Sequence, residues 1–204
     1  MFVQLIQGEV ADTERVHQQF DKWVREVAPG ATGWLGSTAG VTDNGTLVAM
    51  VRFDSAEHAR QNSDRPEQDR WWSETSGLFT TEASFMDSTD VTVDVQGNPE
   101  QAEFVQIIEG KTTNPERGRE LAAQDAEKWA EYRPDVLGSV QADFPGGAYA
   151  MELFFTSEGD ARVGEKKEPP AELKAQMEEM NALSAEPPRF YDLRDPWKYS
   201  PGTS

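Results

Sequence analysis

The stretch FVQLIQG occupies residues 2–8, and the nearly identical stretch FVQIIEG occupies residues 104–110, an offset of 102 residues. Toward the end of each copy the offset grows to 105, which aligns FMDSTD at 85–90 with FYDLRD at 190–195. Similarity at a nearly constant spacing indicates a duplicated structural unit. The sequence therefore predicts two copies of one fold in a single chain.

Each copy is predicted to run strand, helix, strand, strand, helix, strand. In the first copy, Asp12 is a suitable N-cap for a helix, and apolar residues follow it at helical spacing. Asn44 and Gly45 favour the tight turn of a hairpin, and Pro66 interrupts the second helix. In the second copy, helical spacing predicts an inward stripe formed by Leu173, Met177, Met180 and Ser184. This order predicts the α+β, ferredoxin-like βαββαβ fold.

Residues 1–96 and residues 103–199 are the predicted bounds of the two repeats. A ferredoxin-like unit covers one face of its sheet with helices and leaves the other face bare. We therefore expect the repeats to pack sheet to sheet, as an intramolecular dimeric α/β barrel. The alternating segment Asp90–Val95 is expected to reach across and pair with the other copy. Such a chain is a pseudo-dimer by itself, and it is expected to be a monomer.

The charge of the chain limits its partners. Lys and Arg number 19 against 37 Asp and Glu, a net charge of −18. A field of this sign repels phosphate backbones and anionic lipids, so neither nucleic acid nor a membrane is an expected partner. Cysteine is absent, which excludes disulfides and thiolate chemistry. The sequence has no apolar run long enough to span a membrane and does not open with the charged and apolar pattern of a signal peptide, so the expected location is the cytoplasm.

Three segments carry a resemblance to a known superfamily: PGATGWLGSTAGVTDNG at 29–45, NSDRPEQDRWW at 62–72 and RPDVLGS at 133–139. With them the chain resembles the dimeric α/β-barrel superfamily, and in particular antibiotic-biosynthesis-monooxygenase-like proteins and two-repeat proteins of actinobacterial type. The resemblance implies a small aromatic substrate held between helices and sheet, without metal or flavin. Haem-degrading relatives use an Asn, a Trp and a His. This chain has Gln4 at the strand position and no His after its Trp pair, so no cofactor is expected.

The pair Trp71 and Trp72 provides the candidate ligand-binding surface, because an indole ring can stack on a planar ligand and donate a hydrogen bond. Asn62 and Arg65, in the break before the pair, are candidate donors to polar substituents. The second copy has Gln176 and Met177 in place of the two tryptophans. The alternative is structural: the aromatic rings seal the helix onto the sheet, and the break is an ordinary proline effect.

Two residues are candidates for proton transfer. His17 lies at the edge of the first helix's apolar stripe and could act as a base, because histidine is the residue type that exchanges protons most readily at neutral pH. Asp125 is expected on the apolar stripe of the matching helix, where desolvation would raise its pKa and suit it to acid–base catalysis. The alternatives are a packing or surface histidine and a salt-bridged aspartate.

These residues favour a small-molecule pocket protein, with cofactor-independent monooxygenation of a planar aromatic as the leading hypothesis. A binding protein with the same pocket and no turnover is an alternative. A structural or interaction protein without a pocket is another.

Overall fold

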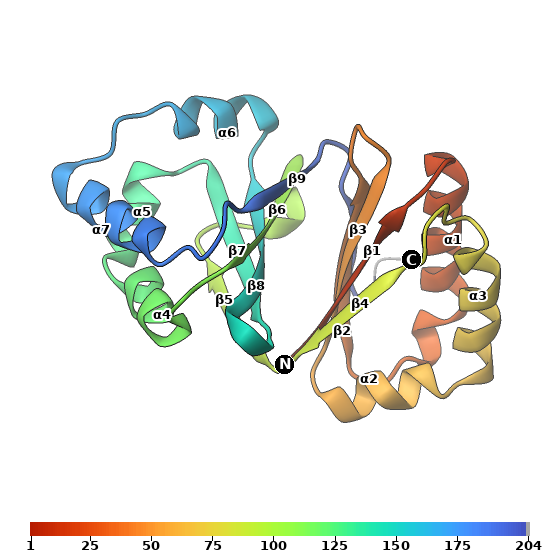
Figure 1. Cartoon of the computed structure of the whole chain (residues 1–204). Coiled ribbons are helices and arrows are strands. Elements are labelled where there is room, and N and C mark those ends of the chain that lie inside the picture. Colours follow the sequence, from red (N-terminus) through yellow and green to blue (C-terminus); the bar gives the residue numbers. More distant parts are fainter. Residues whose placement is uncertain (203–204) are drawn as a thin grey trace. The chain divides into compact units, whose positions relative to one another are not determined.

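The computed structural model describes residues 1–202 and divides the chain into two compact units (Figure 1). The first unit comprises Met1–Val91 together with the C-terminal segment that begins at Asp195, and the second comprises Thr92–Arg194. Within the described residues, no helix is both long enough and apolar enough to cross a membrane.

The first unit is a five-stranded antiparallel sheet with its helices on one face (Figure 1). The order across the sheet is β10-β2-β3-β1-β4. Its elements are β1 (Phe2–Glu9), α1 (Thr13–Glu26), a 3-10 turn (Ala28–Gly30), β2 (Trp34–Val41), β3 (Thr46–Phe53), α2 (Ala56–Ser63), α3 (Pro66–Ser76), β4 (Ser84–Ser88) and β10 (Trp197–Tyr199).

The second unit repeats this plan, with the sheet order β5-β7-β8-β6-β9. Its elements are β5 (Asp90–Val95), β6 (Phe104–Lys111), α4 (Pro115–Ala123), α5 (Ala126–Tyr132), β7 (Val136–Asp143), β8 (Ala148–Phe155), α6 (Glu158–Glu165), α7 (Ala171–Ala182) and β9 (Arg189–Leu193), with 3-10 turns at Pro99–Gln101 and Pro145–Gly147. Two ferredoxin-like repeats in one chain, as predicted, are confirmed.

Local chemistry explains where the helices begin. The Asp12 side chain accepts a hydrogen bond from the backbone N–H of Arg15 at 3.0 Å, as expected of an N-cap. The Ser55 hydroxyl caps α2 in the same way and accepts a hydrogen bond from the backbone N–H of His58 at 3.2 Å. Pro66 is the first residue of α3, which separates the two short helices as predicted.

The two sheets exchange their outermost strands. Strand β5 leaves the first repeat and pairs with β7, which confirms the prediction for Asp90–Val95. Strand β10 follows the second repeat and pairs with β2, with Trp197 opposite Ala39. The compact units therefore differ in extent from the repeats at 1–96 and 103–199, because each unit takes a strand from the end of the other repeat. The packing of one sheet on the other stays a prediction.

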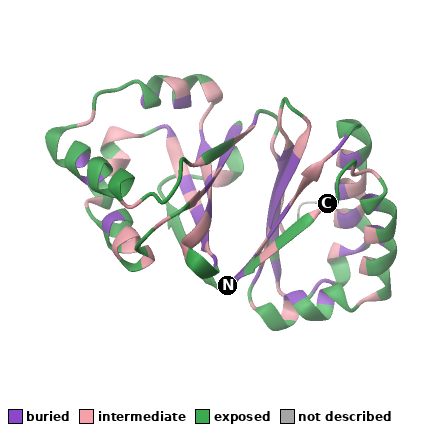
Figure 2. Cartoon of the chain, in the orientation of Figure 1, coloured by how far each residue is buried: buried purple, intermediate pink, exposed green. Residues whose placement is uncertain are grey.

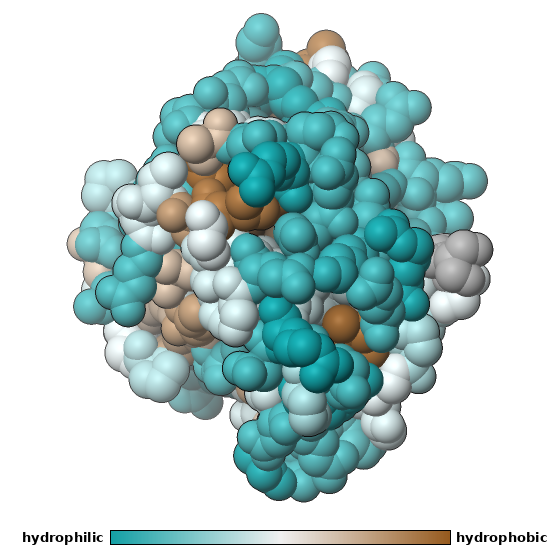
Figure 3. Space-filling model, turned by 90° about the vertical axis from the view of Figure 1, so that its right-hand side faces the viewer, coloured by the Kyte–Doolittle hydropathy of each residue, from teal (hydrophilic) through white to brown (hydrophobic). Residues whose placement is uncertain are grey.

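Apolar residues of the first unit lie between its sheet and its helices. Residues of β1 and β3 alternate between the two faces of the sheet, so Phe2 and Phe53 meet Trp23 of α1 in one buried cluster. Figure 2 shows the buried residues along the strands and on the sheet-facing side of the helices. Figure 3 looks onto the side of the molecule where α1 and α3 lie, and that surface is largely hydrophilic with separate hydrophobic patches. Helices with one apolar side produce this pattern.

The predicted stripe of α7 is wrong. Leu173 is buried, but Met177 and Met180 are 39% and 38% exposed. The second inward residue is Gln176, which donates a hydrogen bond to the Leu121 carbonyl and accepts one from the Trp129 indole. The buried position that periodicity assigns to an apolar residue is thus occupied by a polar residue whose hydrogen bonds are satisfied.

Candidate ligand-binding site

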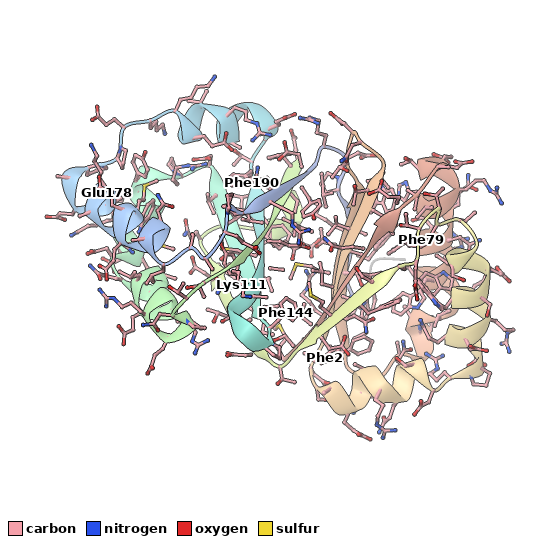
Figure 4. All side chains as sticks on the ribbon, viewed as in Figure 1. Phe2, Phe79, Lys111, Phe144, Glu178 and Phe190 are labelled. Atoms are coloured by element: carbon pink, nitrogen blue, oxygen red, sulfur yellow. The ribbon has the colours of Figure 1, made fainter. Side chains whose placement is uncertain are left out.

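A cavity of about 370 Å³ lies between the sheet and the helices of the first unit. Its lining residues come from β1, β2, β3, β4, β10 and all three α-helices of this unit. They are Phe2, Gln4, Ile6, Phe20, Trp23, Val24, Ser37, Val51, Phe53, Ala56, Ala59, Arg60, Asn62, Ser63, Gln68, Trp71, Asp87 and Tyr199. Cavities that hold small organic ligands have volumes of about 300–1,000 Å³. Figure 4 shows Phe2 at the start of β1, close to α2.

The floor of the cavity is one row of residues that crosses the whole sheet. The strand registers place them side by side in the order Tyr199, Ser37, Val51, Gln4, Asp87. Because alternate residues of a strand face opposite sides, all five side chains face the helices. Four of the five are polar, which gives an otherwise apolar cavity a polar floor.

Aromatic rings form the walls. The ring of Trp71 packs edge-to-face against Phe20, with centroids 5.9 Å apart and an interplanar angle of 87°. The ring centroid of Trp23 lies 6.4 Å from that of Trp71, and both tryptophans are buried. Packed aromatic side chains of this kind suit the flat face of a planar ligand.

Polar groups of the floor are held by hydrogen bonds. Gln4 Nε2 donates to Asp87 Oδ1 at 2.8 Å, and the Trp34 indole donates to the Ser37 hydroxyl at 3.0 Å. The Tyr199 hydroxyl donates to Asp21 Oδ1 at 2.8 Å. Burial, and next the hydrogen bond to Asp21, raise the pKa of Tyr199, so this phenol is protonated at neutral pH.

The structure separates the two tryptophans that the sequence placed together. Trp71 lines the cavity, and its indole nitrogen donates to the Gln19 carbonyl at 2.7 Å. Trp72 is absent from the lining and packs against Phe79 and Phe85. Successive helical residues point about 100° apart, which lets Trp71 face the cavity while Trp72 faces Phe79 and Phe85.

Asn62 and Arg65 belong to one polar network at the break between α2 and α3. Asn62 lines the cavity, donates to Gln68 Oε1 at 3.2 Å and accepts from Arg65 at 2.9 Å. Arg65 does not line the cavity, and its Nη1 also donates to the Val27 carbonyl at 3.0 Å, at the end of α1. Arg65 thereby fastens α1 to the helix break.

His17 lies outside the cavity lining but is connected to it. Its ring stacks on Trp197 of β10, with centroids 4.3 Å apart and an interplanar angle of 4°. Its Nε2 lies 3.8 Å from Asp21 Oδ1, the oxygen that accepts the Tyr199 hydroxyl. A line of three side chains, from His17 through Asp21 to Tyr199, thus ends at the cavity.

The expectation for Asp125 is corrected. Asp125 adopts left-handed backbone angles, with φ of 55°, between α4 and α5 and therefore does not belong to a continuous apolar stripe. A hydrogen bond from Lys128, and next one from Gln124, lower its pKa, whereas the sequence predicted a raised value. Asp125 belongs to the second unit and is not among the residues that line the cavity.

Sequence reasoning did not select Asp87 and Tyr199. The repeat alignment contained a signal for the first, because Asp87 aligns with Asp192 and Gln4 aligns with Gln106. Tyr199 gave no signal, since it belongs to a three-residue strand without measurable periodicity. Among residues 1–202, no group of three or more His, Cys, Asp or Glu side chains is arranged to hold a metal ion.

Comparison with known proteins gives structural similarity without sequence similarity. No protein-family model and no curated protein sequence matches this chain. A proposed monooxygenase from Lactobacillus acidophilus matches with a TM-score of 0.73 and 11% identity over 97% of this chain and 98% of its own. A proposed monooxygenase from Fusobacterium nucleatum matches with a TM-score of 0.72 and 12% identity over 98% and 94% of the two chains.

An anthrone oxidase-like protein also matches, with a TM-score of 0.67 and 13% identity over 97% of this chain and 92% of its own. All three similarities extend over both repeats. They confirm the expected resemblance to antibiotic-biosynthesis-monooxygenase-like proteins at the level of the fold. One fold supports many activities, so an activity has to be argued from the cavity.

Proposed function

We propose that the first unit binds a planar aromatic molecule in its cavity and oxygenates it with O₂, without a cofactor. The observation that carries this proposal is the cavity of about 370 Å³, with aromatic walls and a polar floor, in a fold shared with proposed monooxygenases. The name of the anthrone oxidase-like neighbour suggests the chemical class of the substrate, a fused aromatic with an acidic C–H or O–H group.

The proposed reaction is the conversion of a ring CH₂ group, which lies opposite a carbonyl in the central ring of an anthrone, into a second carbonyl. Loss of a proton from the CH₂ group gives an electron-rich anion that reacts directly with O₂. One oxygen atom enters the product, and the other leaves as water together with the two hydrogens of the CH₂ group. Substrate carbon is oxidised and O₂ is reduced, so the balance needs no further reductant.

The cavity residues would assist by positioning and by proton transfer. Trp71 and Phe20 would contact the flat faces of the substrate and exclude water, while Asn62 would face its edge. Trp72 and Arg65, which lie behind the lining, would hold the helices in place. Tyr199 would pass a substrate proton to Asp21, and Asp21 would pass it to His17. His17 does not line the cavity, so it would act as the base only through Asp21 and Tyr199.

A binding protein without turnover is the second candidate. It is favoured by the raised pKa of Tyr199, because a phenol that holds its proton tightly is a poor proton donor to Asp21 and therefore a poor relay. In that case the same residues would hold a ligand and release it unchanged.

Turnover of anthrone in air and in anaerobic buffer tests the oxygenase. The expected result is formation of the quinone only in air, with one atom from labelled O₂ in each product molecule. Val51→Phe, which fills the middle of the cavity floor, should abolish both turnover and binding. The matched change Leu153→Phe, at the equivalent place in the second unit, should leave both unchanged.

Binding of anthrone that Val51→Phe abolishes, without product in air, would favour the binding protein. Equal turnover by the wild type and by Val51→Phe would contradict the site itself.

A further inference from the structure

The corner of the cavity is the place between Asp87 and Phe2, near α2. The equivalent place in the second unit, between Asp192 and Phe104, is occupied by a side chain. There Arg162 of α6 donates to Asp192 on the edge strand β9, and its guanidinium lies over the Phe104 ring, 5.2 Å from the centroid. Asp192 also accepts a hydrogen bond from Gln106 at 2.8 Å. A carboxylate and the face of a phenyl ring thus bind a planar cation supplied by the chain itself.

The first unit has the same corner, and its arginine also lines the cavity, but within residues 1–202 this arginine makes no ion pair with the aspartate. Gln4 donates to Asp87 at 2.8 Å, as Gln106 does to Asp192, and Phe2 is the counterpart of Phe104. The counterpart of Arg162 is Arg60, which bonds instead to Glu57 at 2.8 Å and to Asp64 at 3.0 Å.

The two arginines therefore differ in exposure, and the two aspartates differ in partners. The side chain of Arg60 is 61% exposed, against 32% for Arg162. Within residues 1–202, Gln4 is the only side chain that donates a hydrogen bond to the Asp87 carboxylate. Asp87 thus lines the cavity without an ion pair to any cation of residues 1–202.

Acidic neighbours on each helix explain the difference between the arginines. Arg60 is held by acids three residues before it and four after it, and Arg162 by acids four residues before it and three after it. At about 100° per residue, the first pair lies roughly 50° to one side of the arginine and the second pair roughly 50° to the other. The acids thus turn the two guanidinium groups in opposite directions.

We propose that the cavity of the first unit binds a planar aromatic cation, such as an aryl amidine or aryl guanidine, with the cationic group between Asp87 and the Phe2 ring. This inference rests on the proposed function for the existence of a ligand in the cavity, and it adds the charge and shape of that ligand. The guanidinium of Arg162 is its internal counterpart in the second unit.

The surroundings of the corner favour such a ligand. A carboxylate forms strong, paired hydrogen bonds with an amidine or guanidine, and the face of an aromatic ring attracts a cation. The aromatic walls at Trp71 and Phe20 accommodate the flat body of the ligand. The net charge of −18 raises the local concentration of cations and repels anions.

Calorimetric titration with benzamidine, and with its neutral counterpart benzamide, tests the proposal on the full chain. The wild type should bind one benzamidine, at least tenfold more tightly than benzamide. Asp87→Asn should weaken benzamidine binding at least tenfold and leave benzamide unchanged. Glu82→Gln removes the same charge from an exposed residue close by in sequence that does not line the cavity, and it should change neither affinity.

Removal of the internal cation should create a second site. Arg162→Ala is expected to bind a second benzamidine, which Asp192→Asn in the same chain should abolish. A folded Arg162→Ala variant that binds one benzamidine would contradict the internal counterpart. If Arg162→Ala does not fold, Asp87→Asn decides the question.

Failure of this inference differs from failure of the proposed function. Equal binding of benzamidine and benzamide by the wild type, or unchanged benzamidine binding by Asp87→Asn, overturns the cation site. Anthrone binding that Val51→Phe abolishes would still support the aromatic pocket in that case. Benzamidine binding that Val51→Phe leaves intact would also overturn the cation site, since benzamidine would then lie outside the cavity, while anthrone binding would still test the aromatic pocket.

Discussion

Trp71 stabilises the first unit through its indole N–H as well as through its ring. The nitrogen donates to the Gln19 carbonyl, whereas Trp72 has no hydrogen-bond partner for its indole within residues 1–202. Trp71→Phe should therefore lower the free energy of unfolding by about 1–2 kcal/mol, as expected for a lost buried hydrogen bond and some packing. Trp72→Phe should cost clearly less. Urea denaturation measures both, and equal costs would contradict the role given to the nitrogen.

Tyr199 should make stability depend on pH in alkaline solution. Burial and the hydrogen bond to Asp21 raise its pKa in the folded protein above the unfolded value of about 10. The folded state then holds the proton more tightly, so this stabilisation is complete below pH ~10 and is lost as the pH rises further. Tyr199→Phe should flatten the fall in unfolding free energy between about pH 10 and pH 12.

Tyr149 provides a control for this measurement, because burial also raises its pKa. Tyr149→Phe should leave the contribution of Tyr199 in place. A Tyr199→Phe variant with the alkaline pH dependence of the wild type would show that burial and the Asp21 contact do not raise the pKa of Tyr199.

At the scale of the element, Arg65 joins α1 to the break between α2 and α3. Its guanidinium donates to the Val27 carbonyl and to Asn62, so Arg65→Ala leaves a helix end without its partner. We expect a loss of about 1.5–3 kcal/mol of unfolding free energy, typical of hydrogen bonds from a charged donor. Arg70→Ala, on a side chain that is 67% exposed, should cost little. Loss of ligand affinity without loss of stability in Arg65→Ala would instead indicate direct ligand contact.

The acids that hold Arg60 on its helix should affect the cavity. In Glu57→Gln/Asp64→Asn, Arg60 loses both ion pairs and can turn toward Asp87, as Arg162 turns toward Asp192. Exposed helical pairs contribute about 0.3–0.5 kcal/mol each, so removal of both should weaken benzamidine binding by about three- to fivefold. Arg60→Ala in the same background should restore the affinity. Calorimetric titration measures these changes, and tighter binding by the double variant would contradict the competition.

Element length explains what could be predicted from the sequence. The helix at Thr13–Glu26 has a capping residue and a full apolar stripe, and it was predicted correctly. Strand β10 has only three residues and follows a proline, so it is too short to show an alternating pattern of apolar and polar residues. The break at Asp125 was missed because a single left-handed residue leaves no trace in apolar spacing. Two consequences follow for the site: Tyr199 was overlooked, and Asp125 was selected on a helix that does not continue through it.

At the scale of the whole molecule, duplication predicted the fold well and the site only in part. Strand and helix order recur in both copies, so each copy supports the prediction for the other. The site depends on differences between the copies, such as Trp71 against Gln176, and a difference alone does not show which copy keeps a cavity. That answer depends on side-chain directions, above all those of Arg60 and Arg162, which the helix periodicity explains once the helix bounds are known.

The exchange of outer strands means that the first repeat alone lacks part of its own cavity. All lining residues except Tyr199 lie within residues 1–91, but Tyr199 and its neighbour Trp197 come from the far end of the chain. A fragment of residues 1–96 should therefore bind benzamidine at least tenfold more weakly than the full chain, because one side of the cavity is open and the edge of β2 is unpaired.

Mixing this fragment with a fragment of residues 97–204 should restore binding, since each fragment carries the strand that the other sheet lacks. The same mixture with Tyr199→Ala in the second fragment should restore less affinity, and Lys198→Ala, whose side chain faces the opposite side of the sheet, is the matched control. Full affinity in the isolated fragment 1–96 would show that β10 does not complete the site.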